Sequence, residues 1–409
     1  MTAPISHNPH TDEHWMAHAL AFAERGRGHV EPNPMVGALV VKDGQLLGQG
    51  YHQAFGQPHA EPNALNDTRA NGHDPAGATC YVTLEPCCHH GKTPPCTNAL
   101  IAAGITRCVV AMQDPDPRVA GKGLQQLRDA GIDVTTGVLE PQAQRLNAGF
   151  TKRILHKLPL VTLKWAMTAD GHTAARTGHS QWISSPASRQ LVHQHRTLAD
   201  AILVGIGTVL ADDPQLTPRD LPEDFIPPPN RSHPRRVVID PQLQTPLTAK
   251  LVTDAQAPTL IAHHPDANPD KKQTLEHLGI ELLELPPIPD THHLNLRPLL
   301  QHLVTQHNAT HTLVEGGSGL AGSLLAQGLA DRALVFVGPQ FLNDDQAPAP
   351  LRGQSTPTLD AAHPLTLHRV TQLGPDALHE YDITPPPPPP RPMYPRGEHP
   401  PPPPPPPTP

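Results

Sequence analysis

The spacing of apolar residues predicts alternating helices and strands in the N-terminal part of the chain. Residues 11–25 repeat apolar side chains at helical intervals, which predicts an amphipathic helix. Four runs have the pattern of strands, the first two separated by a turn signal: 36–41, 46–51, 80–84 and 108–112. Short helices are expected from near His59 and over 97–103. This alternation favours a layered α/β sheet.

A second α/β series begins after Lys157. Residues 161–165 alternate between apolar and polar side chains, and 186–198 have a helical pattern. Five further runs read as strands: 201–205, 236–240, 259–263, 312–317 and 332–339. The series therefore divides the chain into a first domain over 1–153 and a second over 154–384, with no internal repeat between them.

Proline is concentrated at the C-terminal end of the sequence. The chain has 409 residues, which suits two domains of ordinary size, and 17 of its 54 prolines lie in residues 385–409. Such a tract lacks backbone donors and apolar side chains that a core could bury. We expect 385–409 to be a disordered, solvated tail.

Charge and apolar patterning argue against nucleic acid or a membrane as partners. The formal net charge is −8, whereas a nucleic-acid-binding surface normally carries a basic stripe. The N-terminus does not read as a secretory signal, and the longest apolar run, 201–211, is too short to span a bilayer. Five cysteines, at 80, 87, 88, 96 and 108, crowd one region in a way that suggests metal ligation rather than disulfides. The expected compartment is the cytoplasm.

The strongest chemical signal is a histidine followed by two separated cysteines. His59 lies two residues before Glu61, and Cys87 and Cys96 follow a predicted strand. One imidazole and two thiolates give zinc three ligands and leave one position open for water. Glu61 is then free to carry protons, as in the known His-x-Glu, Pro-Cys-x-x-Cys signature of zinc-dependent base deaminases. The second spacing departs from that signature, because eight residues separate the cysteines here.

A closed zinc knuckle is the structural alternative. In that case Cys88, His89 or His90 would supply a fourth ligand. Glu61 would have no role in a closed site, whereas an open site needs a proton carrier at that position. The open, catalytic site is therefore favoured.

The loop between the two cysteines resembles that of a known enzyme family. The sequence EPCCHHGKTPPC at 85–96 is similar to the loop of the bifunctional deaminase–reductases of riboflavin biosynthesis. Further stretches match the same family in order: NPMVGALVV (33–41), GQGYHQAFGQPHAE (48–61) and MQDPDPRVAGKG (112–123). The resemblance extends from about residue 11 to about residue 383. It implies a cytidine-deaminase-like three-layer α/β/α domain followed by a dihydrofolate-reductase-like α/β domain.

For the first domain, the resemblance implies hydrolytic deamination of 2,5-diamino-6-ribosylamino-4(3H)-pyrimidinone 5′-phosphate. It implies that His59, Cys87 and Cys96 hold one Zn²⁺ per chain and that Glu61 is the proton shuttle. The implied substrate-binding residues are Asn33, Lys92 and Thr93, the last two at the phosphate. The structural alternatives are a turn role for Asn33 before Pro34 and a solvated surface position for Lys92. Three positions depart from the family: Cys88 replaces a serine, Asn63 a histidine and Asp116 an asparagine.

The second domain has no G-x-G-x-x-G fingerprint after its first strand, so the pattern does not predict a Rossmann domain. Its matching stretches are LKWAMTADGHTA (163–174), SQWISSPASR (180–189), GIGTVLADDPQLTPR (205–219) and LVEGGSGLAGSLL (313–325). The resemblance implies NADPH-dependent reduction of the ribosyl group to a ribityl chain. Pro241 and the loop 341–350 depart from the family pattern.

The resemblance also assigns residues to the two ligands of the reductase. Those expected to face NADPH are Ala166, Trp182, Thr208, Asp212, Gly317, Ser318, Gly319, Leu320, Ala321, Gly322 and Ser323. Those expected to face the substrate are Ser180, Arg196, Leu216, Arg219 and Glu315.

Elementary chemistry supports part of this reductase assignment. Glycines after the strand let a ligand approach the backbone, and the following helix offers free N–H groups to an anion. Arg196 and Arg219 suit a phosphate, although surface salt bridges are the alternative. A tryptophan such as Trp182 is more often part of a core, and only the resemblance assigns it to the cofactor. Lys164 and Glu315 are the ionisable candidates for a catalytic proton donor.

Two other functional classes compete with this interpretation. A zinc deaminase that acts on another pyrimidine or a nucleic-acid base is disfavoured by the acidic charge, the cysteine spacing and the second domain. A non-catalytic zinc-binding interaction protein is disfavoured by Glu61 and by the reductase motifs. The expected partner is a small pyrimidine ribotide, and a homo-oligomer is left open.

Overall fold

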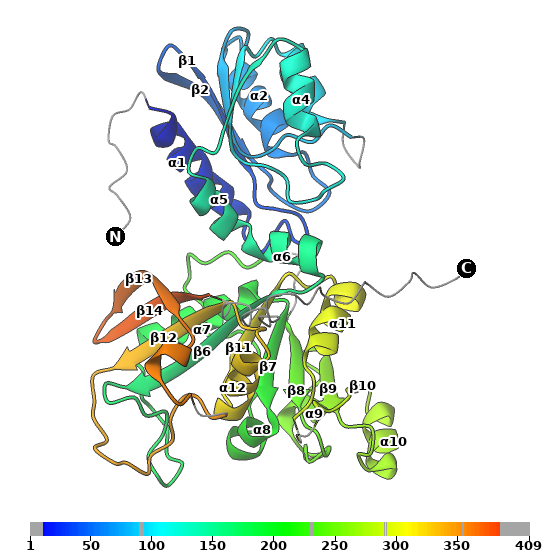
Figure 1. Ribbon diagram of the computed structural model, residues 1–409, viewed down its shortest axis with the longest axis vertical. Coiled ribbons are helices and arrows are strands. Elements are labelled where there is room, and N and C mark those ends of the chain that lie inside the picture. Colours follow the sequence, from blue (N-terminus) through cyan, green and yellow to red (C-terminus); the bar gives the residue numbers. More distant parts are fainter. Residues whose placement is uncertain are drawn as a thin grey trace, which may run out of the picture.

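The computed structural model describes residues 11–89, 94–228, 233–289, 291, 293–353 and 356–384. They form two α/β units, each built on its own sheet (Figure 1). The predicted tail, 385–409, and the predicted phosphate contacts Lys92 and Thr93 lie outside the described residues.

The N-terminal sheet has five strands in the order β2-β1-β3-β4-β5. Its strands are β1 (Gly37–Lys42), β2 (Gln45–Tyr51), β3 (Thr79–Leu84), β4 (Arg107–Met112) and β5 (Asp133–Thr136). Its helices are α1 (Asp12–Ala23), α2 (Ala60–Ala70), α3 (Cys96–Ala102), α4 (Lys122–Asp129) and α5 (Glu140–Leu146). The hairpin β1–β2 is antiparallel, as predicted, whereas β3, β4 and β5 run parallel. Helices α1 and α5 pack on one face and α2, α3 and α4 on the other, so the three-layer prediction is confirmed.

Local sequence explains where the helices of this unit begin. The Thr11 hydroxyl accepts a hydrogen bond from the His14 backbone N–H at 3.3 Å, which caps α1 as predicted. Pro62 lies in the first turn of α2, where a missing N–H is tolerated. Gly50 on β2 lets α2 approach closely, because a Cβ there would lie 2.3 Å from the Ala64 nitrogen. This close approach fixes the start of α2 against the sheet.

The C-terminal sheet has nine strands in the order β10-β9-β8-β7-β11-β6-β12-β14-β13. The strands are β6 (Leu160–Thr168), β7 (Ala201–Gly205), β8 (Arg235–Ile239), β9 (Thr259–His263), β10 (Glu281–Glu284), β11 (His311–Glu315), β12 (Arg332–Gly338), β13 (Leu365–Leu373) and β14 (Asp376–Ile383). The helices are α7 (Pro186–Leu198), α8 (Ile206–Asp212), α9 (Lys250–Thr253), α10 (Pro269–His277), α11 (Arg297–His307) and α12 (Ser318–Ala326). In this order, all the strands from β10 across the sheet to β12 run parallel to one another. The antiparallel hairpin β13–β14 extends the sheet beyond the predicted strands.

Alternating side chains on the parallel strands supply two cores, one on each face of this sheet. On β7, Leu203 belongs to the core that includes residues of α11 and α12, whereas Ile202 and Val204 belong to the core under α8, α9 and α10. Strands buried on both faces read as continuous apolar runs, which explains the sequence AILVG. The apolar run 201–211 is therefore a strand followed by a helix. No helix among the described residues is long and apolar enough to cross a membrane.

Helix α6 (Ala148–His156) joins the two units and lies between them (Figure 1). Lys152 Nζ contacts Asp331 Oδ2 at 2.6 Å, next to β12. A Cβ at Gly149 would lie 2.6 Å from the ring of His311, so the helix packs tightly on the C-terminal sheet. The predicted boundary between 153 and 154 falls inside α6, and a division there would cut a helix.

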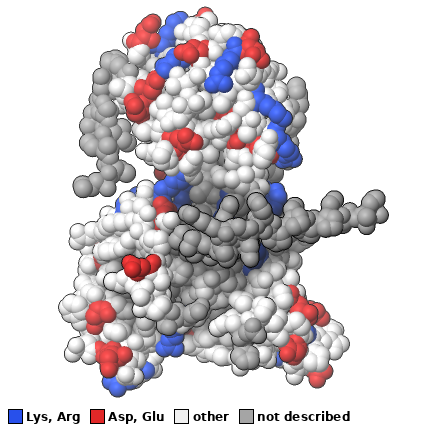
Figure 2. Space-filling view, in the orientation of Figure 1, with Lys and Arg blue, Asp and Glu red and all other residues white. Residues whose placement is uncertain are grey.

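Acidic and basic side chains are interspersed over the molecular surface. Figure 2 shows red and blue side chains scattered among neutral ones, with no continuous basic stripe on the described part of this face.

Candidate active sites

Three predicted ligands meet at one edge of the N-terminal sheet. His59 lies at the N-cap of α2, Cys87 follows β3, and Cys96 is the first residue of α3. His59 Nδ1 is 3.3 Å from Cys96 Sγ and 3.6 Å from Cys87 Sγ. The three ligand atoms lie within 4.8 Å of one another. A nitrogen and two sulfurs at this separation suit a tetrahedral zinc ion.

The ionisation of these side chains also suits a metal. Hydrogen bonds from Cys96 and His59 lower the pKa of the Cys87 thiol to about 4, despite its partial burial. The Cys96 backbone N–H also donates to the Cys87 sulfur, at 3.4 Å. A thiolate already formed at neutral pH is the state in which cysteine binds zinc.

Glu61 lies on the first turn of α2 beside this cluster and is 3% exposed. Burial raises the pKa of its carboxyl to about 6. A carboxyl group that titrates near neutrality can both accept and donate a proton at working pH. Glu61 therefore has the properties of a proton carrier rather than of a structural carboxylate.

The cluster opens onto a cavity of about 370 Å³. Its polar lining residues are Asn33, His52, Gln57, His59, Glu61, Glu85, Cys87, His89, Asp114 and Asp116. His52 Nδ1 donates to the Pro58 carbonyl oxygen at 3.1 Å, so its Nε2 accepts from the Asn33 amide at 3.3 Å. The Asn33 side chain is thus held at the cavity wall rather than left as a simple turn residue.

The neighbouring Cys88 takes no part in the described metal cluster. Cys88 is half-buried and His89 is exposed, and neither converges with the other three ligands. Among the described residues the site thus has three ligands, which leaves the open position that the closed-knuckle alternative would remove. His90 lies outside the described residues.

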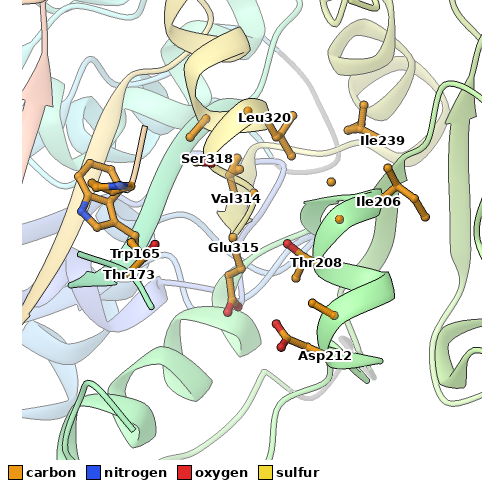
Figure 3. Close-up of a pocket in the computed structure, with 18 of the residues that line it drawn as sticks. Trp165, Thr173, Ile206, Thr208, Asp212, Ile239, Val314, Glu315, Ser318 and Leu320 are labelled. Atoms are coloured by element: carbon orange, nitrogen blue, oxygen red, sulfur yellow. The ribbon is translucent and has the colours of Figure 1, made fainter. Parts of the chain in front are cut away.

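A larger cavity, of about 710 Å³, lies in the C-terminal unit. Figure 3 shows Thr208 and Asp212 on one helix and Ser318 and Leu320 on another, with Glu315 between them. Gly317 has a positive φ of 83°, which turns the chain from β11 into α12. The N-terminus of α12 therefore faces the cavity and can bind an anionic ligand.

A buried ion cluster forms the floor shared by this cavity and a smaller one of about 240 Å³. Glu315 and Lys164 are register partners on the parallel strands β11 and β6. Arg196 Nε and Nη2 donate to the two Glu315 carboxylate oxygens at 2.6 and 2.8 Å. Burial alone would raise the pKa of Glu315, but Arg196 and Lys164 together lower it to about 2. Burial lowers the pKa of Lys164.

Comparison with known proteins identifies both units. Residues 9–112 match the cytidine and deoxycytidylate deaminase zinc-binding region, and residues 159–379 match the RibD C-terminal domain. The riboflavin biosynthesis protein RibD of Aquifex aeolicus is 42% identical over 333 residues, which cover 81% of this chain and 88% of that protein. RibD of Escherichia coli is 44% identical over 344 residues, covering 82% and 89%.

Solved structures give the same result. Acinetobacter baumannii RibD superposes with a TM-score of 0.77 at 39% identity, covering 91% of this chain and 99% of that one. A Thermotoga maritima protein described as a diaminohydroxyphosphoribosylaminopyrimidine deaminase/5-amino-6-(5-phosphoribosylamino)uracil reductase has a TM-score of 0.76 at 34% identity, covering 92% and 100%. The chain belongs to the RibD family. It is a bifunctional enzyme of riboflavin biosynthesis, and both fold predictions are confirmed.

Most of the residues predicted to face the cofactor of the reductase line the larger cavity. They are Ala166, Thr208, Asp212, Gly317, Ser318, Gly319, Leu320, Ala321 and Ser323. Gly322 does not line it, because it packs against the Arg352 backbone, and a Cβ there would lie 1.8 Å from the carbonyl oxygen. Trp182 lines the smaller cavity instead and stacks beneath the Arg189 guanidinium at 4.2 Å.

The predicted substrate residues of the reductase divide between the two cavities. Ser180, Arg196 and Glu315 line both, Leu216 lines the larger one, and Arg219 lines the smaller one. Nothing in the sequence had singled out His193, which lies in the smaller cavity with an unpartnered Nδ1. Burial lowers the pKa of His193 to about 4, so it is a neutral polar group there.

The buried carboxylate of Glu85 connects two segments of the deaminase cavity, and the sequence motifs did not predict this role. Glu85 accepts hydrogen bonds from four backbone N–H groups: Asp114 at 3.2 Å, Gly121 and Gly123 at 2.9 Å, and Leu124 at 3.3 Å. Three of these groups belong to the N-terminus of α4, where a negative charge is stabilising. Glu85 therefore fixes the Asp114–Gly121 loop beside Cys87.

Glu85→Gln should loosen this loop. The –NH₂ group of glutamine cannot accept the hydrogen bonds that the backbone N–H groups donate to the carboxylate oxygen that it replaces. We expect the free energy of unfolding of the N-terminal unit to fall by about 1–3 kcal/mol. Deaminase kcat/KM should fall as well, with reductase activity unchanged. Activity assays and thermal unfolding check this, with the exposed Glu13→Gln as the matched control. Unchanged deamination in Glu85→Gln would contradict a positioning role.

Proposed function

We propose that the N-terminal unit deaminates 2,5-diamino-6-ribosylamino-4(3H)-pyrimidinone 5′-phosphate and that the C-terminal unit reduces the product with NADPH. The observation that carries the proposal is the convergence of His59, Cys87 and Cys96 within 4.8 Å on a cavity that Glu61 also lines. The second unit offers a separate cavity of about 710 Å³, large enough for a dinucleotide.

Zinc is the metal that the donor set supports. Two sulfurs and one imidazole nitrogen favour Zn²⁺ over hard cations such as Mg²⁺. A zinc ion held by these three side chains would polarise a water molecule and lower its pKa. Glu61 then accepts the proton of the attacking water and returns it to the leaving amino group, which departs as ammonia. The raised pKa of Glu61, about 6, supports both transfers.

The polar wall of the deaminase cavity supports recognition of a pyrimidinone. The Asn33 amide, oriented by His52, offers donors and an acceptor to the ring or the ribose. Asp114 and Asp116 line the same wall and can accept from amino or hydroxyl groups. Lys92 and Thr93 remain predicted phosphate contacts outside the described residues.

The reductase cavity supports a nicotinamide dinucleotide. A Cβ at Gly207 or Gly319 would meet nothing within 4 Å, so the glycine-lined wall is open to close ligand approach. The N–H groups at the start of α12 suit the diphosphate, and the bound cofactor would supply a hydride. NADPH rather than NADH is assigned on the resemblance of the sequence motifs.

The shared ion cluster favours Lys164 over Glu315 as the proton donor. Glu315 was one of the two predicted candidates, but a carboxyl group with a pKa of about 2 holds no proton at neutral pH. Its bidentate pair with Arg196 makes it a structural counter-ion. Lys164 lines both cavities and has a pKa lowered by burial, which makes its ammonium a better acid.

The same cluster favours Arg219 over Arg196 as the phosphate ligand. The guanidinium of Arg196 is engaged by Glu315 and by the Thr217 carbonyl oxygen at 3.2 Å. The Arg219 side chain is 50% exposed, and the ion pair that it makes among the described residues is a loose one with Asp220 at 3.9 Å. It is therefore able to turn toward a ribose phosphate at the smaller cavity.

We further propose a cytoplasmic location, which the five free cysteines support. A small pyrimidine ribotide is the proposed substrate.

Glu61→Gln tests the deaminase assignment directly. The wild-type enzyme should release ammonia from the ribotide without NADPH and oxidise NADPH only after deamination. The variant should keep its zinc but lose about 10²–10⁴-fold in deamination, because the proton carrier is gone while the ligands remain. Reduction of supplied deaminated substrate should be unaffected. Appreciable ammonia release by the variant would remove Glu61 from the mechanism.

The adjacent cysteines test the ligand set. Cys88→Ser should bind as much zinc as the wild type and deaminate normally, because Cys88 lies outside the cluster. Cys87→Ser and Cys96→Ser should each lose one zinc and the deaminase activity. Atomic absorption and ammonia release measure the two effects. Loss of zinc from Cys88→Ser alone would shift the ligand set by one residue.

Arg219→Ala tests the phosphate assignment. A lost charge-assisted contact of roughly 1.5–3 kcal/mol should raise the KM for the reductase substrate about tenfold to a hundredfold. The affinity for NADPH, measured by fluorescence titration, should change little. An equal loss of cofactor affinity would show that Arg219 contacts the dinucleotide instead.

A further inference from the structure

A second group of metal-ligating side chains lies at the far edge of the C-terminal sheet, away from both cavities. Glu281 is the first residue of the edge strand β10, and His302 and His307 lie on the last part of α11. One ligand atom from each of the three lies within 4.8 Å of the other two. None of these residues lines either of the reductase cavities.

Both imidazoles converge on the same carboxylate oxygen. His302 Nε2 is 2.7 Å and His307 Nε2 is 3.1 Å from Glu281 Oε1. A carboxylate oxygen only accepts, so each contact contains an imidazole proton that a cation can displace. Ligand atoms around a tetrahedral zinc ion with bonds of about 2.0–2.2 Å lie roughly 3.3 Å apart. The two separations from Glu281 Oε1 are close to that value, and the two imidazole nitrogens lie within 4.8 Å of each other.

Neighbouring residues orient the three side chains but leave them accessible to solvent. Arg235 Nη1 on β8, two strands away in the sheet, donates to the other carboxylate oxygen, Glu281 Oε2, at 2.7 Å. An outer hydrogen bond of this kind fixes the orientation of a ligating carboxylate and leaves Oε1 facing the histidines. The side chains of Glu281, His302 and His307 are 31%, 25% and 23% exposed. A cation can therefore enter from solvent, and water can complete its coordination.

We propose that Glu281, His302 and His307 form a second metal site that binds a divalent transition-metal cation such as Zn²⁺. Two imidazole nitrogens and one carboxylate oxygen are ligands that zinc accepts, and the set contains no thiolate. The bound cation would tie β10, which pairs with β9 alone among the described strands, to the end of α11. The site is structural and independent of either reaction.

Zinc counting on the full-length enzyme tests the proposal. The protein is freed of metal with a chelator, dialysed against buffered Zn²⁺ and measured by atomic absorption. The wild type should bind two zinc ions and Cys96→Ser one, while His302→Gln should bind one and keep deaminating. The combination of Cys96→Ser and His302→Gln should bind none. Affinity for the second zinc should fall by roughly tenfold or more when one ligand is removed.

A stability measurement on the Cys96→Ser background separates this site from the deaminase site. Zinc should raise the melting temperature of Cys96→Ser, and this rise should disappear when His302→Gln or Glu281→Gln is added. The exposed His277→Gln serves as the control for non-specific binding by histidine and should leave the rise intact. A wild-type enzyme that binds one zinc, lost on Cys96→Ser, would overturn the second site and leave the deaminase site standing. A second zinc that persists in both His302→Gln and Glu281→Gln would overturn it as well.

Discussion

The deaminase cavity depends on a single buried carboxylate. Glu85 follows β3 directly and accepts four backbone N–H groups from the Asp114–Leu124 segment. Gly123 has to be a glycine for this to happen, because a Cβ there would lie 2.1 Å from the Pro86 carbonyl oxygen. One anion thus joins the segment that carries Cys87 to the loop that carries Asp114 and Asp116. The thiolate and the substrate-facing wall are therefore positioned by one interaction rather than by separate ones.

In the reductase unit, the register between neighbouring strands positions the charged side chains of the site. Glu315 lies at the carboxyl end of β11, its register partner Lys164 lies in the middle of the longer parallel strand β6, and Arg196 reaches both from α7. In an open α/β sheet, ligand sites form at the carboxyl ends of the strands. Burying three charged groups together is favourable only when they are paired, and the bidentate Arg196–Glu315 contact meets that condition. In the proposed reduction, this pairing leaves Lys164 as the proton donor.

The sequence predicts the local chemistry better than the long-range contacts. The zinc cluster could be predicted because residue type and spacing carry the signal, and Gly317 because only a glycine readily adopts that backbone turn. The roles of Glu85 and His52 could not, because their partners lie far away in the sequence or are backbone groups. The ion pair between Arg196 and Glu315, which is 119 residues away in the sequence, could not be predicted for the same reason. The hairpin β13–β14 escaped prediction because β13 is largely exposed and lacks a buried apolar run.

The two catalytic units are not mechanically independent, because one helix serves both. Phe150 and Ile154 on α6 line the deaminase cavity. Lys152, on the same helix, pairs with Asp331, whose carboxylate also accepts from the Val161 backbone at the start of β6. The wall of one cavity is thereby tied to β6 and β12, two adjacent parallel strands of the other unit. A deaminase domain ended at residue 153 would lack Ile154 and the sheet that holds α6 in place. The deaminase cavity is therefore lined in part by a helix that the reductase unit holds in place, so the cavity depends on the fusion of the two enzymes in one chain.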